Sequence, residues 1–295
     1  MFARTFQLTL LLLSPSAFAQ EAGPAPALAP WKDELFALPA TLTERDGGAY
    51  RIVNYQSTVA INQRDAIPER KVRDEYVSSE PLALQKDRRV KTKAGYVSHF
   101  TVGATEGVSI ITLYIHGKGG NREQGVDDAT FGGNFNRLKN LMVRNNGLYI
   151  SPDFESFTGR GAKEIGGLIL HYKSLSPNAK VIVAAGSAGG RILYQLARDR
   201  EVAPHLSGLL FLGSFSDSGY MSSLAFQNRV PVYIGHGSAD YISLVQNMEN
   251  FYRALRERDP SYPTRMVRFA TGTHGTPIRM TDWRETINWM LSAPR

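Results

Sequence analysis

The sequence predicts an α/β protein with a mostly parallel central sheet and helices on both faces. From Ser109 onwards, short apolar runs of strand type alternate with amphipathic helical patterns, which is the order that a parallel sheet with crossover helices requires. Between about Tyr50 and Gly107 the apolar pieces are shorter and are separated by polar links, so we expect antiparallel N-terminal strands leading into the sheet. The 295 residues suffice for one large domain with a full core.

The first twenty residues have the anatomy of an export signal. One early cation, Arg4, precedes the apolar run Leu8–Leu13, and small residues follow at the positions that define a cleavage site. The run is too short to span a bilayer as a stable helix. We therefore expect a signal peptide at 1–19, a Pro/Ala-rich linker and N-terminal extension at 20–49, and one domain at 50–295, in a protein that is periplasmic or secreted.

The composition is that of an ordinary globular protein, with 42% hydrophobic and 21% charged residues. There is no cysteine, which excludes disulfides and a lipid-anchored cysteine. Removing the signal takes away only Arg4, so the formal charge falls from +7 to +6. This modest basic balance favours peripheral contact with an anionic membrane or polysaccharide. The cations are scattered, apart from the run Lys86–Lys91, which we interpret as a solvated loop or edge strand. We expect neither a nucleic-acid partner nor a transmembrane segment in the mature chain.

The individual elements follow from apolar periodicity. The expected strands are Tyr50–Val53, Glu75–Val77, Gly95–Val102, Ser109–Ile115, Leu148–Ile150, Val181–Ala185, Leu209–Leu212, Val230–Ile234 and Arg265–Ala270. Helical stripes lie between the later strands, near residues 135–142, 165–175, 192–197, 244–255 and 283–291. In the second of these, Ile165, Leu168, Ile169, Tyr172 and Leu175 recur at the spacing of one helix face.

The stretch Val181–Arg191 carries an apolar strand directly into a glycine-flanked serine and then into a helical pattern. Ala185 and Gly189, two residues before and two after Ser187, have almost no side chain. A serine on a strained strand-to-helix turn needs such flanks, because larger ones would collide across the turn. The turn exposes the hydroxyl beside the positive end of the helix. A glycine-rich loop without chemistry would look the same, so the motif alone leaves both interpretations open.

Three further loops with reactive side chains also leave expected strand ends: His116–Gly120, the loop of Asp240 and the loop of His274. The carboxyl ends of parallel strands share one edge of a sheet, so these loops should lie near Ser187. A serine hydroxyl is a poor nucleophile unless a histidine takes its proton, and the histidine needs a carboxylate to fix its tautomer. Ser187, His274 and Asp240 supply these three groups, and along the chain they come in the order Ser187, Asp240, His274, each at the end of a separate strand.

These loops also allow other assignments. Asp217 also follows a strand and is an alternative to Asp240 as the acid. His236 lies only four residues before Asp240, so we expect it to pack or orient that loop rather than act as the base. Lys118 in His116–Gly120 would suit a phosphate-binding loop, but that motif needs Ser or Thr after the lysine, and Gly119 follows.

Three loop carboxylates could border the site, and we interpret them as solvated or loop-structuring groups; these are Asp127, Asp128 and Asp153. No cluster of His and Asp has convincing metal-ligand spacing, so we expect no metal and no cofactor.

From about Ser109 to Leu291, the sequence resembles the α/β-hydrolase superfamily, in its serine esterase and lipase-like branch. Ala185–Gly189 is similar to the nucleophile elbow, with alanine in place of the first glycine, and His116–Gly120 is similar to the His-Gly oxyanion motif. Gly235–Asp240 resembles the acid-bearing loop, and His274 with its flanking glycines resembles the histidine loop.

The resemblance implies an α/β-hydrolase fold and a role for each motif residue. Ser187 would be the nucleophile, His274 the base, and Asp240 the acid that orients it. The oxyanion hole would be formed by the backbone N–H groups of Lys118 and Ala188, with Gly117 as neighbour.

These expectations describe an exported serine hydrolase that cleaves carboxylic esters through an acyl-enzyme. Relatives often insert a helical cap between the strands that correspond to Leu209–Leu212 and Val230–Ile234, and the short link here indicates an open site. An open site suits small-molecule esters and esters presented on lipid aggregates or acylated polysaccharide, including phospholipid acyl esters. Two alternatives stay open: a serine peptidase or amidase on the same fold, and a catalytically idle α/β-hydrolase that acts as a binding protein.

Overall fold

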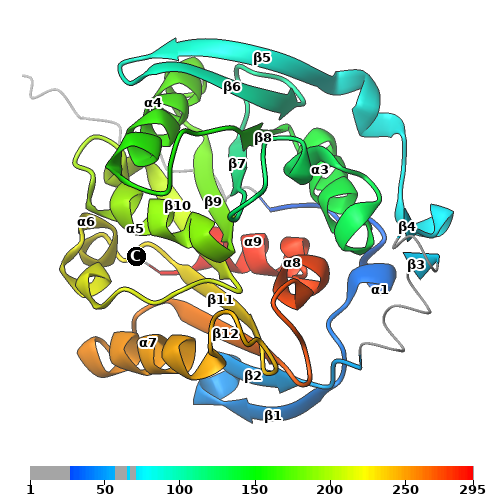
Figure 1. Cartoon of the computed structure of the whole chain (residues 1–295), viewed down its shortest axis with the longest axis vertical. Helices are drawn as coiled ribbons and strands as arrows, with labels where there is room; N and C mark the ends of the chain where they lie inside the picture. The colour runs from blue at the N-terminus through cyan, green and yellow to red at the C-terminus, as the bar shows by residue number, and fades with distance from the viewer. Residues whose placement is uncertain (1–26, 57–64, 67–70, 295) are drawn as a thin grey trace, which may run out of the picture.

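The computed structural model describes residues 27–56, 65–66 and 71–294. The expected signal peptide at 1–19 and the first part of the linker lie outside the described residues. The described part forms one ten-stranded mixed sheet in the order β1-β2-β12-β11-β10-β9-β7-β8-β6-β5, with helices on both faces (Figure 1). The predicted fold class, an α/β protein with a mostly parallel sheet, is confirmed.

Six strands form the parallel centre of this sheet. They are β7 (Ile110–Ile115), β8 (Gly147–Pro152), β9 (Lys180–Gly186), β10 (Leu206–Leu212), β11 (Val232–Gly237) and β12 (Thr264–Phe269). Every neighbouring pair among them is parallel. Almost all of their residues are buried, because helices cover both faces, and this is why they appear in the sequence as continuous apolar runs.

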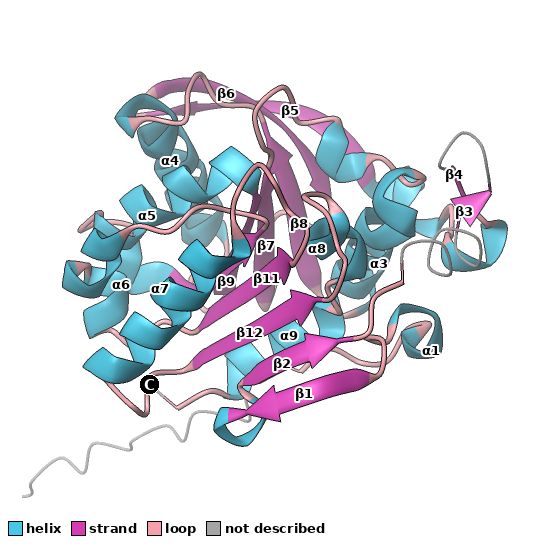
Figure 2. Ribbon diagram, turned by 60° about the horizontal axis from the view of Figure 1, so that its bottom comes forward, coloured by secondary structure: helices cyan, strands magenta, loops and turns pink. Residues whose placement is uncertain are grey.

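The two ends of the sheet are built differently. At one end, β5 (Gln85–Thr92) pairs antiparallel with β6 (Gly95–Val102), which pairs antiparallel with β8. At the other end, β2 (Tyr50–Val53) runs parallel to β12, and β1 (Thr41–Arg45) returns antiparallel beside β2 (Figure 2). The basic run Lys86–Lys91 is therefore an edge strand, and its exposed charges discourage pairing with another chain. The segment before Tyr50 also contributes to the sheet, through β1.

The layers on the two faces come from different helices. One face carries α4 (Gly159–Leu175), α5 (Gly190–Arg198), α6 (Leu224–Gln227) and α7 (Val245–Arg258). The other carries α3 (Asn134–Arg144), α8 (Thr276–Met280) and α9 (Trp283–Ser292). Each layer encloses its own apolar cluster against the sheet. Within the described ranges, no helix has the length and apolar character needed to cross a bilayer.

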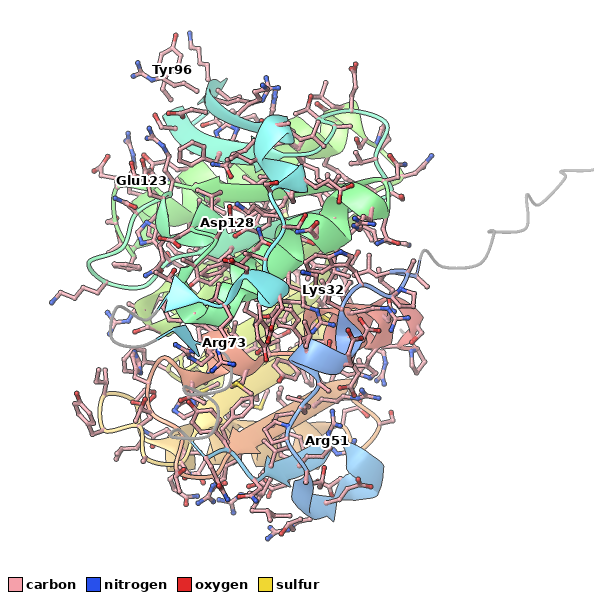
Figure 3. All side chains as sticks on the ribbon, turned by 90° about the vertical axis from the view of Figure 1, so that its right-hand side faces the viewer. Lys32, Arg51, Arg73, Tyr96, Glu123 and Asp128 are labelled. Carbon is pink, nitrogen blue, oxygen red and sulfur yellow. The ribbon has the colours of Figure 1, made fainter. Side chains whose placement is uncertain are left out.

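The strand expected at Glu75–Val77 is wrong: this stretch contains the 3-10 helix η2 (Asp74–Tyr76). The reason is tertiary. The ammonium of Lys32, just before α1 (Asp33–Phe36), donates to the carbonyl oxygens of Glu75 at 2.5 Å and Val77 at 3.0 Å. Lys32 is labelled in Figure 3. These two carbonyl oxygens therefore accept hydrogen bonds from the N-terminal segment and not from a neighbouring strand. The other short elements before β5 are β3 (Asp65–Ala66), β4 (Lys71–Val72), η1 (Asp46–Gly48) and η3 (Glu80–Leu84).

A buried arginine joins α1 to the main domain. The side chain of Arg137, on α3, is fully buried and forms ion pairs with Asp33 at 3.0 Å and Asp282 at 3.1 Å. Its guanidinium also lies 4.7 Å from the ring centroid of Phe36. Three segments distant in sequence thus meet at the Arg137 guanidinium. Its removal would leave Asp282 without its ion-pair partner, whereas Asp33 would keep Arg284 at 2.6 Å.

A buried histidine on β6 makes stability depend on pH. His99 Nδ1 lies 3.0 Å from the carbonyl oxygen of Val97, which can only accept, so Nδ1 carries the proton and Nε2 accepts from the Tyr172 hydroxyl at 2.6 Å. Burial lowers the pKa of His99 from 6.5 to about 4. Between pH 4 and 6.5 this histidine binds more protons in the unfolded chain than in the folded one. The stability contributed by neutral His99 is therefore complete above pH 6.5 and is lost as the pH falls towards 4.

We therefore expect the free energy of unfolding to fall by about 3 kcal/mol from this group as the pH is lowered from 6.5 to 4. In His99→Gln, the amide replaces both hydrogen bonds without titrating, so this part of the pH dependence should vanish. Urea unfolding of both proteins at several pH values measures it. Equal pH slopes in the two proteins would contradict the assignment.

Candidate active site

Ser187 lies on a strained turn between β9 and α5. It opens the 3-10 turn η6 (Ser187–Gly189) and has φ 49°, in the left-handed region that a non-glycine residue rarely occupies. A Cβ on Gly189 would lie 3.3 Å from the Cβ of Ala185 and 2.7 Å from the carbonyl oxygens of Ile115 and His116. The small flanks seen in the sequence are thus required by close approach across the turn, as expected. The serine itself is half-buried.

Asp240 and His274 form a hydrogen-bonded pair at the same edge of the sheet. Asp240 follows β11, His274 follows β12, and His274 Nδ1 lies 2.7 Å from Asp240 Oδ2. The Asp240 side chain is fully buried, whereas that of His274 is 22% exposed. Because the carboxylate accepts, we assign the proton to Nδ1 of His274, which leaves Nε2 free to take a proton.

The carboxylate of Asp240 is held by three further donors. Its Oδ1 accepts from the backbone N–H groups of Ile242 at 2.9 Å and Ser243 at 3.0 Å. Nε2 of His236 lies 3.3 Å from Oδ2 and 2.6 Å from the carbonyl oxygen of Ser243, so it also carries a proton. Burial by itself raises the pKa of Asp240, but the hydrogen bonds from His236, His274 and the backbone together hold the pKa well below its usual range. The acid is therefore ionised at neutral pH.

Two residues of the loop after β10 connect the serine turn to this pair. The hydroxyl of Ser214 donates to the carbonyl oxygen of Ser187 at 2.8 Å, and the hydroxyl of Ser243 donates to the carbonyl oxygen of Ser214 at 2.5 Å. Gly213 has φ +57°, and a Cβ there would lie 2.7 Å from the carbonyl oxygen of His274. Neither Gly213 nor Ser214 could be recognised as a site residue from the sequence, because only the folded chain brings their loop against the other two.

The loop that carries the predicted oxyanion donors also reaches Ser187. A Cβ on Gly117 would lie 3.0 Å from the Cβ of Ser187 and 3.6 Å from its Oγ. The carbonyl oxygen of Gly117 lies 2.9 Å from His116 Nδ1 and accepts from the Gly120 N–H at 3.1 Å. In a trans peptide the N–H of Lys118 points opposite to this carbonyl, so the same two hydrogen bonds fix its direction. The Lys118 side chain is exposed and Ala188 is half-buried.

The alternative acid lies in a separate cluster. Asp217 forms an ion pair with Arg198 at 2.7 Å and accepts from the Gly219 N–H at 2.8 Å. The other loop carboxylates also have structural partners. These are Arg122 for Asp153, Lys139 for Asp128, and the N–H groups of Ala129 and Thr130 for Asp127. Within the described part of the chain, no group of three or more His, Cys, Asp or Glu side chains could hold a metal ion.

The strand order, the serine on its turn after β9 and the acid and histidine after β11 and β12 together define an α/β-hydrolase fold. Comparison with solved structures agrees. The chain is similar to an esterase of Pyrococcus furiosus at 13% identity and a TM-score of 0.52, over 72% of this chain and 94% of the esterase. It is similar to a thermostable esterase at 14% identity and a TM-score of 0.55, over 72% of this chain and 64% of that one.

A third similar structure is an α/β serine hydrolase homologue from Coxiella burnetii, at 15% identity and a TM-score of 0.50, over 69% of this chain and 95% of that one. At these identities the likeness establishes the fold. No protein-family model matches the sequence, and no curated protein matches it significantly. The chain thus has the α/β-hydrolase fold that its motifs indicated.

Gly213 allows a test of how tightly the fold holds His274. In Gly213→Ala, the new methyl group would collide with the His274 backbone and lie 3.6 Å from its Nδ1. With His274 as the predicted base, we expect kcat for ester hydrolysis to fall roughly 100-fold, because small displacements of a reacting group have effects of that size. Gly107→Ala is the matched control, since Gly107 has φ +66° but open space around its Cβ position. It should lose about 1 kcal/mol of stability and keep kcat. Equal kcat in both variants would refute this role of Gly213.

Proposed function

We propose that this protein is a serine hydrolase that cleaves carboxylic esters through an acyl-enzyme on Ser187. The observation that carries the proposal is the 2.7 Å hydrogen bond between His274 and Asp240, at the sheet edge where Ser187 lies on its strained turn. Esterases among the similar structures support the choice of an ester substrate.

Each residue would have a defined part in the reaction. Nε2 of His274 takes the proton of the Ser187 hydroxyl as its oxygen attacks the ester carbonyl, and ionised Asp240 stabilises the imidazolium that forms. The N–H groups of Ala188 and Lys118 donate to the oxyanion, because backbone donors already fixed in place need no reorganisation. His274 then protonates the leaving alcohol, and a water molecule activated by the same base releases the acid.

The surroundings of the site favour an acyl ester with an apolar part. Between β10 and β11 the chain forms only the 3-10 helix η8 (Ser218–Ser222) and the four-residue α6, which leaves little material for a cap. Immediately after Asp240, three large apolar side chains are exposed: Tyr241 at 83%, Ile242 at 51% and Leu244 at 60%. Such a patch beside a reaction centre fits an acyl chain or a lipid surface better than a soluble polar substrate.

Export and contact with anionic surfaces belong to the same proposal. The signal-like residues 1–19 and the basic charge support a periplasmic or secreted enzyme that meets phospholipid or acylated polysaccharide. The mass of the purified mature protein tests the cleavage site after Ala19. An intact N-terminus on the exported protein would contradict it.

The activity is tested with aryl esters of short and long acyl chains, phosphatidylglycerol vesicles and peptide anilides, together with a fluorophosphonate probe. We expect turnover of the aryl esters and a probe adduct on the peptide that contains Ser187. Cleavage of the anilides alone would establish a peptidase or amidase. Absence of turnover and of labelling would establish a binding protein on this fold.

A further inference from the structure

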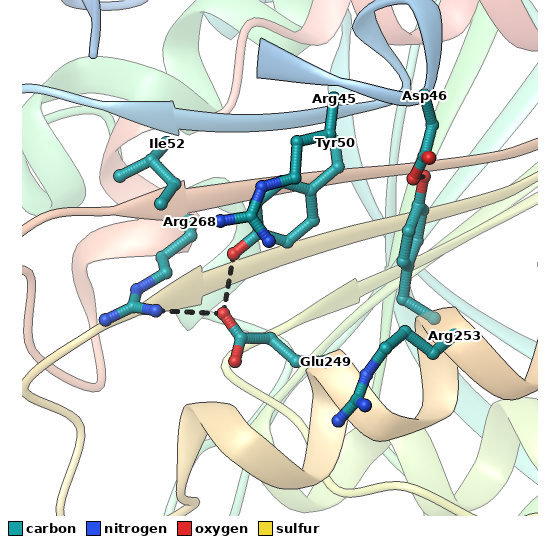
Figure 4. Close-up of a pocket in the computed structure, with 8 residues that line it drawn as sticks. Arg45, Asp46, Tyr50, Ile52, Glu249, Arg253 and Arg268 are labelled. Carbon is teal, nitrogen blue, oxygen red and sulfur yellow. Dashed lines mark hydrogen bonds and ion pairs between the residues drawn. The ribbon is translucent and has the colours of Figure 1, made fainter. Parts of the chain in front are cut away.

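A cavity lies between the β1–β2 hairpin and α7, and none of its lining residues belongs to the proposed active site. Its volume is about 390 Å³, within the range of small-molecule sites. Three stretches of the sequence, within 45–52, 249–253 and at 268, line it (Figure 4). The lining residues are Arg45, Asp46, Tyr50, Ile52, Glu249, Tyr252, Arg253 and Arg268.

The two carboxylates of this cavity are already engaged. Oε1 of Glu249 accepts from the Tyr50 hydroxyl at 2.6 Å and from Arg268 Nη1 at 3.0 Å, as Figure 4 shows. Oδ2 of Asp46 accepts from the Tyr252 hydroxyl at 2.7 Å. Burial raises the pKa of both tyrosines, so they stay protonated and keep donating. Both carboxylates thus accept hydrogen bonds from other residues that line the cavity.

The cavity has more positive than negative groups, with three arginines against two carboxylates. Of the three arginines, only Arg268 pairs with a carboxylate, and its buried Nε has no hydrogen-bond partner. Among the described residues, Arg45 and Arg253 form no ion pair; Arg45 lies 5.4 Å from the ring centroid of Tyr50, and Arg253 donates to Asn250. Guanidinium groups recognise phosphate and carboxylate through paired donors. The unpaired guanidinium groups of Arg45 and Arg253 therefore favour the binding of an oxyanion.

The walls add an apolar contribution. The rings of Tyr50 and Tyr252 lie 5.7 Å apart at 56°, and Ile52 flanks them on β2. The two tyrosines are only 6% and 3% exposed, so they line the cavity with little open ring surface. We propose that the cavity binds a small anionic molecule of monosaccharide size, with a phosphate or carboxylate held by Arg45 and Arg253. The proposal does not depend on ester hydrolysis.

Isothermal titration of the full chain tests this site. The probes are inorganic phosphate, glucose 6-phosphate, glucuronate and neutral glucose, each at low and physiological salt. We expect glucose 6-phosphate or glucuronate to bind more tightly than phosphate, and glucose not to bind. Affinity should fall as salt rises, because the arginines are exposed. Comparison of the two sugar anions identifies the charged group.

The test variant is the double substitution Arg45→Gln/Arg253→Gln, and Arg258→Gln is its matched control. The double variant should weaken binding at least about tenfold, since each charged hydrogen bond contributes that much. Arg258 is exposed at the end of α7 and does not line the cavity, so its variant loses a charge on the same helix and should bind normally. Ser187→Ala should also bind normally, which separates this site from the proposed active site.

Three results would overturn the proposal. They are absence of binding by every anion, equal binding by the wild type and the double variant, and equal binding of glucose and its charged derivatives. The first two would mean that the arginines are only solvated surface groups. Thermal unfolding of each variant verifies that it is folded, which exposed substitutions should permit.

Discussion

Replacing Ser187 with alanine is expected to lower kcat for ester hydrolysis by about 10⁴- to 10⁶-fold, because the variant keeps the proposed oxyanion donors but loses the proposed nucleophile. Ser187 is half-buried on a turn of φ 49°, and alanine also disfavours that conformation, so the fold should be changed only slightly. Stopped assays at high enzyme concentration with a short-chain aryl ester measure the residual rate.

A serine outside the site provides the control for this prediction. Ser174 lies on α4, and its hydroxyl donates to the carbonyl oxygen of His171 at 2.7 Å. Ser174→Ala should retain wild-type kcat and wild-type labelling by a fluorophosphonate. Ester turnover that is equal in wild type and Ser187→Ala would remove Ser187 from the mechanism, whatever the substrate.

Replacing Asp240 with asparagine is expected to lower kcat by about 10⁴-fold with little change in volume. The N–H groups of Ile242 and Ser243 require an acceptor, so the amide oxygen should take the place of Oδ1. The amide nitrogen then faces Nδ1 of His274, and since both would be donors, the proton of the imidazole must move to Nε2. A histidine with that tautomer cannot accept the proton of Ser187.

The alternative acid supplies the matched control. Asp217→Asn should change kcat by less than about threefold, since Asp217 pairs with Arg198 on the neighbouring helix. The comparison of kcat in the two variants decides between the two acids. A large loss in Asp217→Asn with normal turnover in Asp240→Asn would reverse the assignment. Because Asp240 keeps a low pKa, its ionisation should contribute nothing to the pH profile of the wild type near neutrality.

The parallel centre of the sheet was predictable because its signals are local. Buried strands such as β9 and β10 are continuous apolar runs, and the helices between them show a 3.6-residue period. The serine turn was predictable for a related reason, since its geometry demands small neighbours at fixed offsets and Ala185 and Gly189 approach each other across it. The order of the strands then brought the loops of Asp240 and His274 to one edge.

The errors and omissions arise from contacts between distant segments. Lys32 donates hydrogen bonds to the carbonyl oxygens of Glu75 and Val77, and this stretch forms a 3-10 helix although its residues have strand propensity. The position of β2 beside β12 depends on pairing residues more than two hundred positions apart, which leaves no pattern within either segment. Arg137 has the sequence signature of a solvated charge, and only its two carboxylate partners make its burial possible.

The sequence by itself therefore determined the α/β class, most of the strands and helices, and the small set of side chains among which a reaction centre must be sought. The tertiary structure alone decided that Asp240 and His274 are bonded, that His236 shares the same carboxylate, and that Gly213 must lack a side chain beside them. It alone assembled the arginine cavity from β1, β2, β12 and α7. Periodicity is a property of neighbours along the chain, whereas hydrogen bonds and cavities form between residues that only folding brings together.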